Sequence, residues 1–223
     1  MTSNEKSAFR FAAVIVQLWS RFPIFGKIFM AWFVQKCPYI IHYYPNREDF
    51  NDDHSYLTAC GYTVKSDSKS ESEESFLNKM RAMIKIYAAI IQSNAPNNPH
   101  DINNGWMWLA LILNSPPLPN LTPAILHAFL FISAHKLLST YQKQFMKLLI
   151  FIELTYIPMI GKVQSISENV IKQTLGQLKL YIEKIMKKLK RNPSPNEILP
   201  DGVLKDYFWQ DTYSHSRSFT STF

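Results

Sequence analysis

Cysteine and glycine are both scarce in this 223-residue chain, which contains 2 cysteines and 6 glycines. Cys37 and Cys60 are too few for a disulfide framework or a cysteine-based zinc site, so we expect a reducing compartment and no bound metal. So few glycines also argue against a glycine-rich phosphate loop. The chain therefore lacks the simplest signatures of secreted scaffolds and of nucleotide-binding enzymes.

Catalytic constellations are missing as well. Cys37 and His42 lie close together in the sequence, but no third group is placed to orient a thiol–imidazole pair. His127 and His135 are two turns apart, too far for the adjacent-turn pairing that binds zinc in HExxH helices. We therefore predict that the chain is not an enzyme.

Long uninterrupted apolar runs are also missing. Residues 11–19 are apolar but are soon followed by Arg21, and residues 145–160 are broken by charges such as Glu153 and by a proline. A membrane-spanning helix needs about 20 predominantly apolar residues. We therefore expect no membrane insertion and interpret both stretches as buried helices.

Helical periodicity is the strongest positive signal. Phe76, Met80, Met83, Tyr87 and Ile91 recur at intervals of 4, 3, 4 and 4 residues, which places them on one face of a helix. The last long segment repeats apolar residues at intervals of 4, 3, 4, 3 and 4. We predict helices over residues 8–19, 24–35, 76–91, 104–113, 141–157, 165–190 and 203–209, and one beginning at 122.

Loops and helix starts are predicted from polar residues and prolines. Residues 66–75 are nearly all Ser, Asp, Glu and Lys and indicate a solvated loop. Ser70 and Glu73 have the spacing of a capping box. Thr122 and Pro123 are typical of an N-cap followed by the first helical residue. Residues 56–61 are interpreted as a short turn.

Short connections between these helices predict an all-α fold, a HEAT-like or MIF4G-like superhelical stack of antiparallel helices. We expect residues 1–7 to be disordered, residues 8–210 to form the helical domain, and residues 211–223 to form a disordered tail.

A surplus of basic residues gives the chain a net charge of +7 and an isoelectric point near 9.3. This surplus favours anionic partners such as nucleic acid, inositol phosphates or acidic protein surfaces. Cations crowd the end of the last long helix, where they form either a solvated face that complements the helix dipole or a patch for phosphate or RNA. This candidate basic patch consists of Lys184, Lys187, Lys188, Lys190 and Arg191.

Several large side chains could be interpreted as stacking platforms for bases. Their helical spacing among Leu and Ile predicts instead that they belong to the core. These residues are Trp106, Trp108, Phe129, Phe131, Tyr141 and Phe145, together with Met80, Met83 and Met146.

One segment resembles the signature of a known family. Residues 29–45 read FMAWFVQKCPYIIHYYP, a helix that ends in a lysine followed by Cys-Pro-Tyr and an aromatic-Tyr-Pro turn. This segment is similar to the C-terminal domain of the Gle-type mRNA-export nucleoporins. The similarity continues in order through residues 62–65, 76–92, 105–110, 112–114, 141–145, 147–150 and 208–209.

The resemblance implies a helical, HEAT-like domain at the cytoplasmic face of the nuclear pore complex, in a protein of the nucleus and cytoplasm. It implies binding to a DEAD-box RNA helicase, stimulation of its ATPase cycle and export of polyadenylated mRNA. Inositol hexakisphosphate would bridge the two proteins, and an FG nucleoporin would dock on the same domain. The family is also tied to translation initiation and termination, so initiation factors are expected partners.

Two departures from the family pattern bear on the inositol hexakisphosphate site. The resemblance assigns to it Lys36, but Trp32 and Gln35 stand where the family has cations. We therefore expect weak binding, because a polyphosphate requires several converging cations.

The resemblance also implies that the N-terminal part of the family domain is missing here. Neighbouring helices would then be absent, and we expect Phe9, Phe11, Val14 and Trp19 to be partly uncovered. Two alternatives to helicase activation remain open. The chain could be an RNA-binding helical scaffold, or a degenerate family member that docks at the pore without activating the helicase.

Overall fold

The computed structural model describes residues 3–64, 70–162 and 168–191, with side chains over 7–64, 70–162 and 170–188. Most of these residues are helical, and within the described ranges the only β pairing is an isolated bridge between Val64 and Ser70. The elements are α1 (Ser3–Arg21), α2 (Pro23–Lys36), η1 (Pro38–Ile41), η2 (Arg47–Asp49), α3 (Asp53–Ala59), α4 (Glu73–Ile91), α5 (Ile102–Asn114), α6 (Thr122–Phe151), η3 (Ile152–Tyr156), α7 (Ile157–Gly161) and α8 (Glu168–Arg191).

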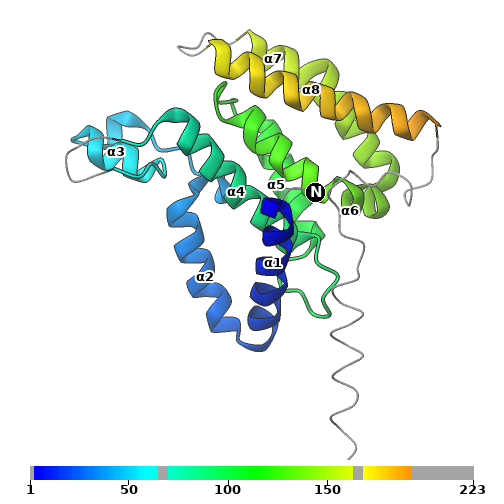
Figure 1. Ribbon diagram of the computed structural model, residues 1–223, viewed down its shortest axis with the longest axis horizontal. Coiled ribbons are helices and arrows are strands. Elements are labelled where there is room, and N and C mark those ends of the chain that lie inside the picture. The colour runs from blue at the N-terminus through cyan, green and yellow to red at the C-terminus, as the bar shows by residue number, and fades with distance from the viewer. Residues whose placement is uncertain (1–2, 65–69, 163–167, 192–223) are drawn as a thin grey trace, which may run out of the picture.

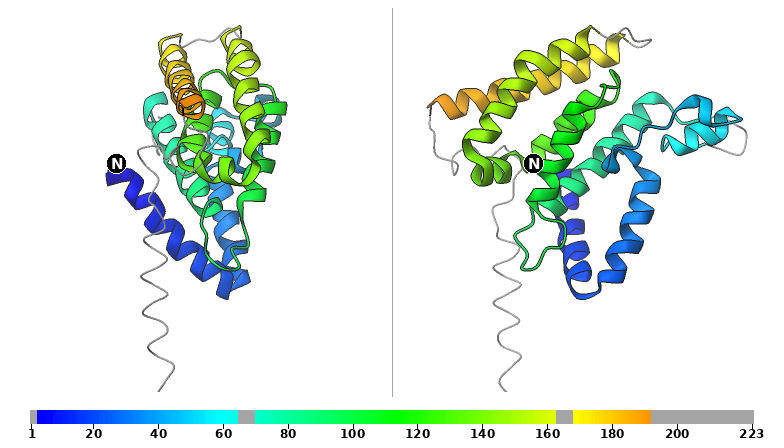
Figure 2. Two further views of the ribbon diagram at one scale, coloured as in Figure 1. Left: turned by 90° about the vertical axis from the view of Figure 1, so that its right-hand side faces the viewer. Right: turned by 180° about the vertical axis from the view of Figure 1, so that it is seen from behind.

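The long helices stack in a fixed order of neighbours. The α2 helix packs against α1, α1 against α4, α4 against α6, and α6 against α8, while α5 contacts both α4 and α6. Figure 1 shows α1 and α2 as a hairpin at one end and α7 and α8 lying together at the other, and the views in Figure 2 agree. The prediction of an all-α stack of helices is confirmed.

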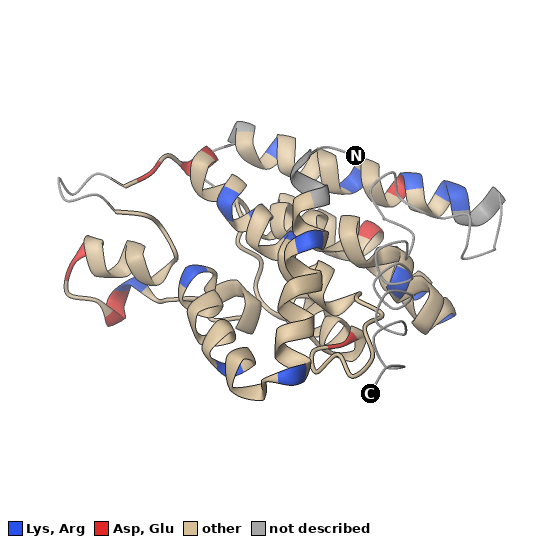
Figure 3. Ribbon diagram, turned by 60° about the horizontal axis from the view of Figure 1, so that its bottom comes forward, with Lys and Arg blue, Asp and Glu red and all other residues tan. Residues whose placement is uncertain are grey.

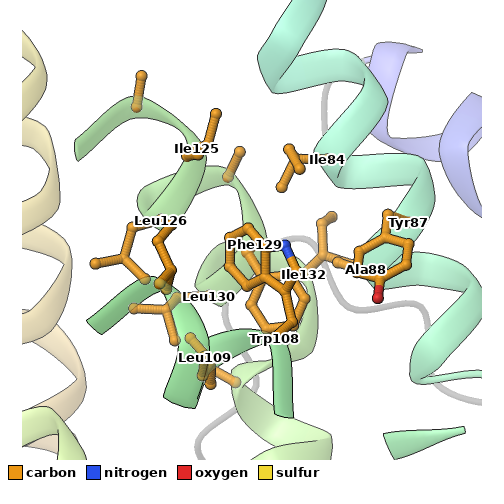
Figure 4. Packing of buried hydrophobic residues seen from close by; sticks show 14 of the residues in the cluster. Ile84, Tyr87, Ala88, Trp108, Leu109, Ile125, Leu126, Phe129, Leu130 and Ile132 are labelled. Carbon is orange, nitrogen blue, oxygen red and sulfur yellow. The ribbon is translucent and has the colours of Figure 1, made fainter. Parts of the chain in front are cut away.

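The core lies where α4, α5 and α6 meet. Trp108 of α5 stacks on Phe129 of α6, with ring centroids 4.4 Å apart, and both side chains are buried. Ile84 and Tyr87 of α4 lie beside this pair of rings, as Figure 4 shows. Burial of such large apolar side chains is the main favourable term in the stability of a helical stack.

Close contact between α1 and α2 depends on a glycine. A Cβ atom at Gly26 would lie 1.9 Å from the indole Nε1 of Trp19, so only glycine allows the indole to lie over this point of the α2 backbone. Pro23 at the first turn of α2 fixes the sharp start of the second helix.

The ends of several predicted helices require correction. Ser72, not Ser70, caps α4 by accepting a hydrogen bond from the Ser75 N–H, because Ser70 pairs with Val64 instead. Thr122 is the first residue of α6 and not its N-cap, since its hydroxyl accepts a bond from the Leu118 N–H.

Two predictions of non-helical structure are wrong. Residues 3–7, expected to be disordered, belong to α1, and most of residues 56–61, expected to be a turn, belong to α3. Asp52 starts α3 by accepting a hydrogen bond from the Ser55 N–H at 2.8 Å. The predicted helix at 203–209 and the tail at 211–223 lie outside the described residues.

The predicted helices at 122 and 141–157 form one run that is interrupted at Gln142. This residue has φ 43° and ψ −112°, which breaks the helical geometry near the point where we expected the second helix to begin. By length and composition alone, residues 122–161 could also cross a membrane. In this structure, however, the run packs against α4, α5 and α8 and buries Phe129, Phe145 and Tyr156.

Candidate binding surfaces

The Cys-Pro-Tyr signature forms a buried corner between α2 and the core. Pro38, Tyr39 and Ile40 of η1 are buried, as is Cys37 before them. The Tyr39 hydroxyl donates to the Cys60 carbonyl at 3.1 Å, and the Trp108 indole N–H donates to the Tyr39 carbonyl at 3.1 Å. Most of the signature therefore shapes the fold and does not form an exposed site.

The two thiols are buried and not paired with each other. Burial raises the pKa of Cys37 to about 12, and burial lowers the pKa of His42 to about 4. A neutral thiol and a neutral imidazole do not form the ion pair of a cysteine nucleophile. Among the described residues, no group of three or more His, Cys, Asp or Glu could hold a metal ion.

Lys36 lies at the C-terminal end of α2 and is exposed to solvent, as is Gln35. Trp32, one turn earlier, is 51% exposed and packs against Phe29 and Phe33, with centroid separations of 6.4 and 6.3 Å. The structure therefore places Lys36, Trp32 and Gln35 on one short stretch of accessible surface, with an indole where a second cation is expected.

Exposed apolar side chains recur along the α1–α2 hairpin, and together they are called its apolar face. Phe11 and Val14 of α1 are 59% and 56% exposed, in accordance with the sequence prediction. Phe9 and Trp19 are half-buried, and the Trp19 ring stacks on His100 at 5.4 Å. Further exposed members of this apolar face are Leu18, Phe22, Ile24 and Ile28.

The candidate basic patch lies on α8 as the sequence predicts. Lys184 and Lys187 are exposed and Lys188 is half-buried, and Figure 3 shows basic residues recurring along this helix. The side chains of Lys190 and Arg191 lie outside the described residues, although both positions belong to α8. The helix C-terminus adds a favourable dipole for these cations.

A groove between α4, α6 and α8 brings Lys184 close to cations that sequence analysis did not connect with it. The groove has a volume of about 430 Å³. Its polar and aromatic lining is made by Arg81, Lys85, His127, Gln177, Tyr181 and Lys184. The spacing of Arg81 and Lys85, one helical turn apart, was the available signal, but only the tertiary structure places α8 opposite them.

The aromatic lining of this groove is ordered by edge and face contacts. The rings of His127 and Tyr181 meet edge to face at 5.3 Å, and the Lys85 ammonium lies 5.6 Å from the centroid of Phe131. The Tyr181 hydroxyl donates to the Leu130 carbonyl at 3.1 Å, so this phenol is tied to α6. Burial raises the pKa of Tyr181.

The histidine of the groove is held neutral near physiological pH. Burial, with further contributions from the charges of Lys85 and Arg81, lowers the pKa of His127 to about 4. Burial also lowers the pKa of Arg81, while the charge of Glu74 raises it. The groove therefore concentrates positive charge where solvent can only partly screen it.

The large side chains predicted to be core residues follow two patterns. Trp108, Phe129, Phe145 and Met80 are buried. The others are half-buried and pack against the core: Trp106, Phe131, Tyr141, Met83 and Met146. The prediction that this set forms core and not a row of stacking platforms is confirmed for the fully buried members.

Together, the fold and these surfaces define a class: an all-helical stacked scaffold with a basic face and an exposed apolar face. Comparison with known proteins then gives the family. The family model described as GLE1-like protein matches residues 1–153, well over half of the chain. The chain belongs to the GLE1-like family.

Two curated relatives illustrate the similarity. The mRNA export factor GLE1 of Rattus norvegicus is 34% identical over 216 residues, which cover 94% of this chain and 30% of that protein. The mRNA export factor GLE1 of Danio rerio is 37% identical over 164 residues, covering 71% of this chain and 24% of that protein. The chain thus spans less than a third of the length of either relative.

A solved structure shares the fold. One chain of a structure of the S. cerevisiae Dbp5 C-terminal domain bound to Gle1 and IP6 superimposes with a TM-score of 0.67. The superposition covers 83% of this chain and 61% of that chain, at 22% sequence identity. At this identity the comparison establishes the helical architecture.

Proposed function

We propose that this chain is part of an mRNA export factor that acts at the cytoplasmic face of the nuclear pore by binding and activating a DEAD-box RNA helicase. The observation that carries the proposal is family membership over most of the chain, with relatives named as mRNA export factors. The shared fold with a complex of Gle1, the Dbp5 C-terminal domain and IP6 supports the choice of partner.

The proposed mechanism is a shift between helicase conformations. An activator without catalytic groups changes the helicase cycle only by binding one conformation more tightly than another. A packed stack of helices suits this role, because it presents several surfaces to a helicase whose lobes move. Exposed apolar and basic faces on the same scaffold give it the surfaces for such contacts.

Inositol hexakisphosphate enters this proposal as a weak ligand. Lys36 is accessible at the end of α2, but Trp32 and Gln35 beside it contribute no charge. A neutral amide forms a weaker hydrogen bond to phosphate than a cation does. We therefore expect Lys36 to contribute to the tether and the neighbouring positions to limit its affinity.

The test is the RNA-stimulated ATPase rate of the cognate DEAD-box helicase, measured with and without this chain and inositol hexakisphosphate. We expect stimulation by the chain, increased by the inositol phosphate. Lys36→Gln should reduce the inositol-dependent part, whereas Lys27→Gln, which removes an exposed cation from the same helix, should leave it unchanged. Absence of both stimulation and helicase binding would overturn the proposal.

A second candidate function is direct RNA binding by the basic patch. Lys184 lines the groove with Arg81 and Lys85, and Lys187 and Lys188 lie within the next turn of α8, which favours RNA binding over an ordinary solvated helix face. Binding to single-stranded RNA would then weaken steeply with salt, and removing one phosphate contact would reduce the slope of log affinity against log salt by about 0.7. Lys187→Gln should show this change, and Lys179→Gln should not.

Two further parts of the proposal concern docking. An FG nucleoporin and translation initiation factors are the proposed additional partners, as the family resemblance implies. If the chain localises to the pore, yet neither activates the helicase nor binds RNA, it is a degenerate member that retains only docking. Imaging of a fluorescent fusion at the nuclear rim, combined with the ATPase assay, separates these outcomes.

A further inference from the structure

The groove between α4, α6 and α8 has the composition of an anion site. Its cations come from two helices that face one another: Arg81 and Lys85 from α4, and Lys184 from α8. None of the residues that line it is acidic. Cations that converge on one groove repel one another, and an anion that binds between them relieves this repulsion.

Arg81 is only partly satisfied by the protein itself. One terminal nitrogen donates to the Asn78 side-chain oxygen at 3.1 Å. Its Nε is shielded from solvent and has no hydrogen-bond partner among the described residues. A shielded guanidinium short of acceptors is costly to maintain, and an oxyanion in the groove would offset that cost.

The remaining lining indicates what kind of anion fits. His127 and Gln177 supply neutral hydrogen-bonding groups, and Tyr181 supplies an apolar ring wall. A volume of about 430 Å³ is larger than a single carboxylate requires and accommodates a ligand of several non-hydrogen atoms. A planar guanidinium with a second cation opposite is the arrangement that proteins use for phosphate groups.

We propose that this groove binds a phosphate-bearing ligand through Arg81, Lys85 and Lys184. The site is separate from Lys36, because α2 lies beyond α1 from α4 in the stack and does not line the groove. It is therefore a second anion site, independent of the helicase tether proposed above.

The probe for this test is inorganic diphosphate, and the readout is the ring resonances of His127 in the intact chain. Bound diphosphate favours the charged form of the imidazole, so its addition should raise the pKa of His127 from about 4. The charged and titratable groups that face His127 are Arg81 and Lys85 of α4 and Tyr181 and Lys184 of α8.

Substitutions then test the contacts. Arg81→Gln and Lys184→Gln should each weaken diphosphate binding about tenfold, the effect of losing one charge-assisted hydrogen bond. Arg81→Lys keeps the charge but loses the planar fork, and should give an intermediate loss. Lys179→Gln, an exposed cation on α8 that does not line the groove, is the matched control and should bind as the unaltered chain does.

Inositol hexakisphosphate and a single-stranded oligoribonucleotide distinguish the sources of the phosphate. If one of these ligands displaces diphosphate from the unaltered chain but not from Arg81→Gln, the proposal is supported and the ligand is identified. An unchanged His127 pKa on addition of diphosphate overturns it. Equal losses of affinity in Arg81→Gln and Lys179→Gln also overturn it, because they indicate a general effect of net charge.

Discussion

Replacing Trp108 by phenylalanine tests the link between the Cys-Pro-Tyr corner and the core. The indole has two roles: its ring stacks on Phe129 at 4.4 Å, and its N–H donates to the Tyr39 carbonyl at 3.1 Å. Phenylalanine keeps an aromatic ring in the core but removes the donor. The substitution therefore separates the hydrogen bond from most of the packing.

The magnitude follows from what the corner loses. The Tyr39 carbonyl keeps a longer bond, at 3.4 Å, from the His42 N–H, so we take the lower part of the usual range, about 1–2 kcal/mol, for its lost partner. The smaller ring leaves a cavity of tens of cubic ångströms, which adds about 1 kcal/mol. Together these predict a loss of about 2–3 kcal/mol, or roughly 5–10 °C in Tm for a chain of this size.

The assay is urea and thermal unfolding followed by circular dichroism. Trp106→Phe is the matched control, because Trp106 lies two residues away on the same helix and is half-buried against Tyr141, with ring centroids 4.3 Å apart. There the phenyl ring retains much of the stacking, and we expect a loss of about 1 kcal/mol or less. Equal losses in the two variants would refute the reasoning about the corner.

Three further predictions follow from local structure. Gly61 has φ 90°, and a Cβ atom there would lie 3.0 Å from the carbonyl that ends α2, so Gly61→Ala should destabilise by about 1–3 kcal/mol. Gly176→Ala, where a Cβ meets nothing within 4 Å, should instead stabilise α8 by about 0.5–1 kcal/mol, and urea unfolding of both variants checks the contrast. The folded pKa values of His42 and His127, about 4, lie below the ordinary value of 6.5. Between pH 6.5 and about 4 the unfolded chain therefore binds more protons than the folded chain. The free energy of unfolding should then fall with decreasing pH by up to about 1.4 kcal/mol per pH unit for each histidine. Urea unfolding at several pH values measures this loss, and a free energy that does not change with pH would contradict the prediction. Ile28 is 66% exposed, so Ile28→Ser should change the free energy of unfolding by less than about 0.5 kcal/mol. It should also lower self-association measured by light scattering, because it removes an apolar group from the apolar face of the hairpin. Stronger self-association would show that this face does not drive association.

The positions of the long helices could be predicted because their apolar residues recur at helical intervals. The stripe that includes Phe76, Met80 and Tyr87 defines α4, and burial of all three confirms that it faces inward. The break at Gln142 lies close to the predicted start of a second helix, although no glycine or proline marks the position.

Helix starts were less predictable, because several polar residues compete for each one. Ser70 and Ser72 both precede α4, and the choice depends on Ser70 pairing with Val64. Thr122 turns its hydroxyl back to Leu118 and so does not cap α6. Such choices are settled by neighbouring backbone groups that a linear pattern does not specify.

Some of the candidate surfaces could be predicted from the sequence and others could not. Lys184, Lys187 and Lys36 could be identified from sequence because each is a cation at or near a helix end. The groove could not, because it joins Arg81 to Lys184 across a distance of more than a hundred residues in the chain. Only the packing of α4 and α8 against a common α6 brings these charges together.

The central position of α4 has a consequence for how this molecule opens. Both α1 and α6 pack against α4, and the α1–α2 hairpin and α8 lie at opposite ends of the stack. Either end can therefore unfold without first disturbing the other. Amide protons should then exchange slowest in α4 and progressively faster outward in both directions. A partner that binds one end of the stack would slow amide exchange from that end up to α4. Amide exchange at the opposite end would keep its own rate.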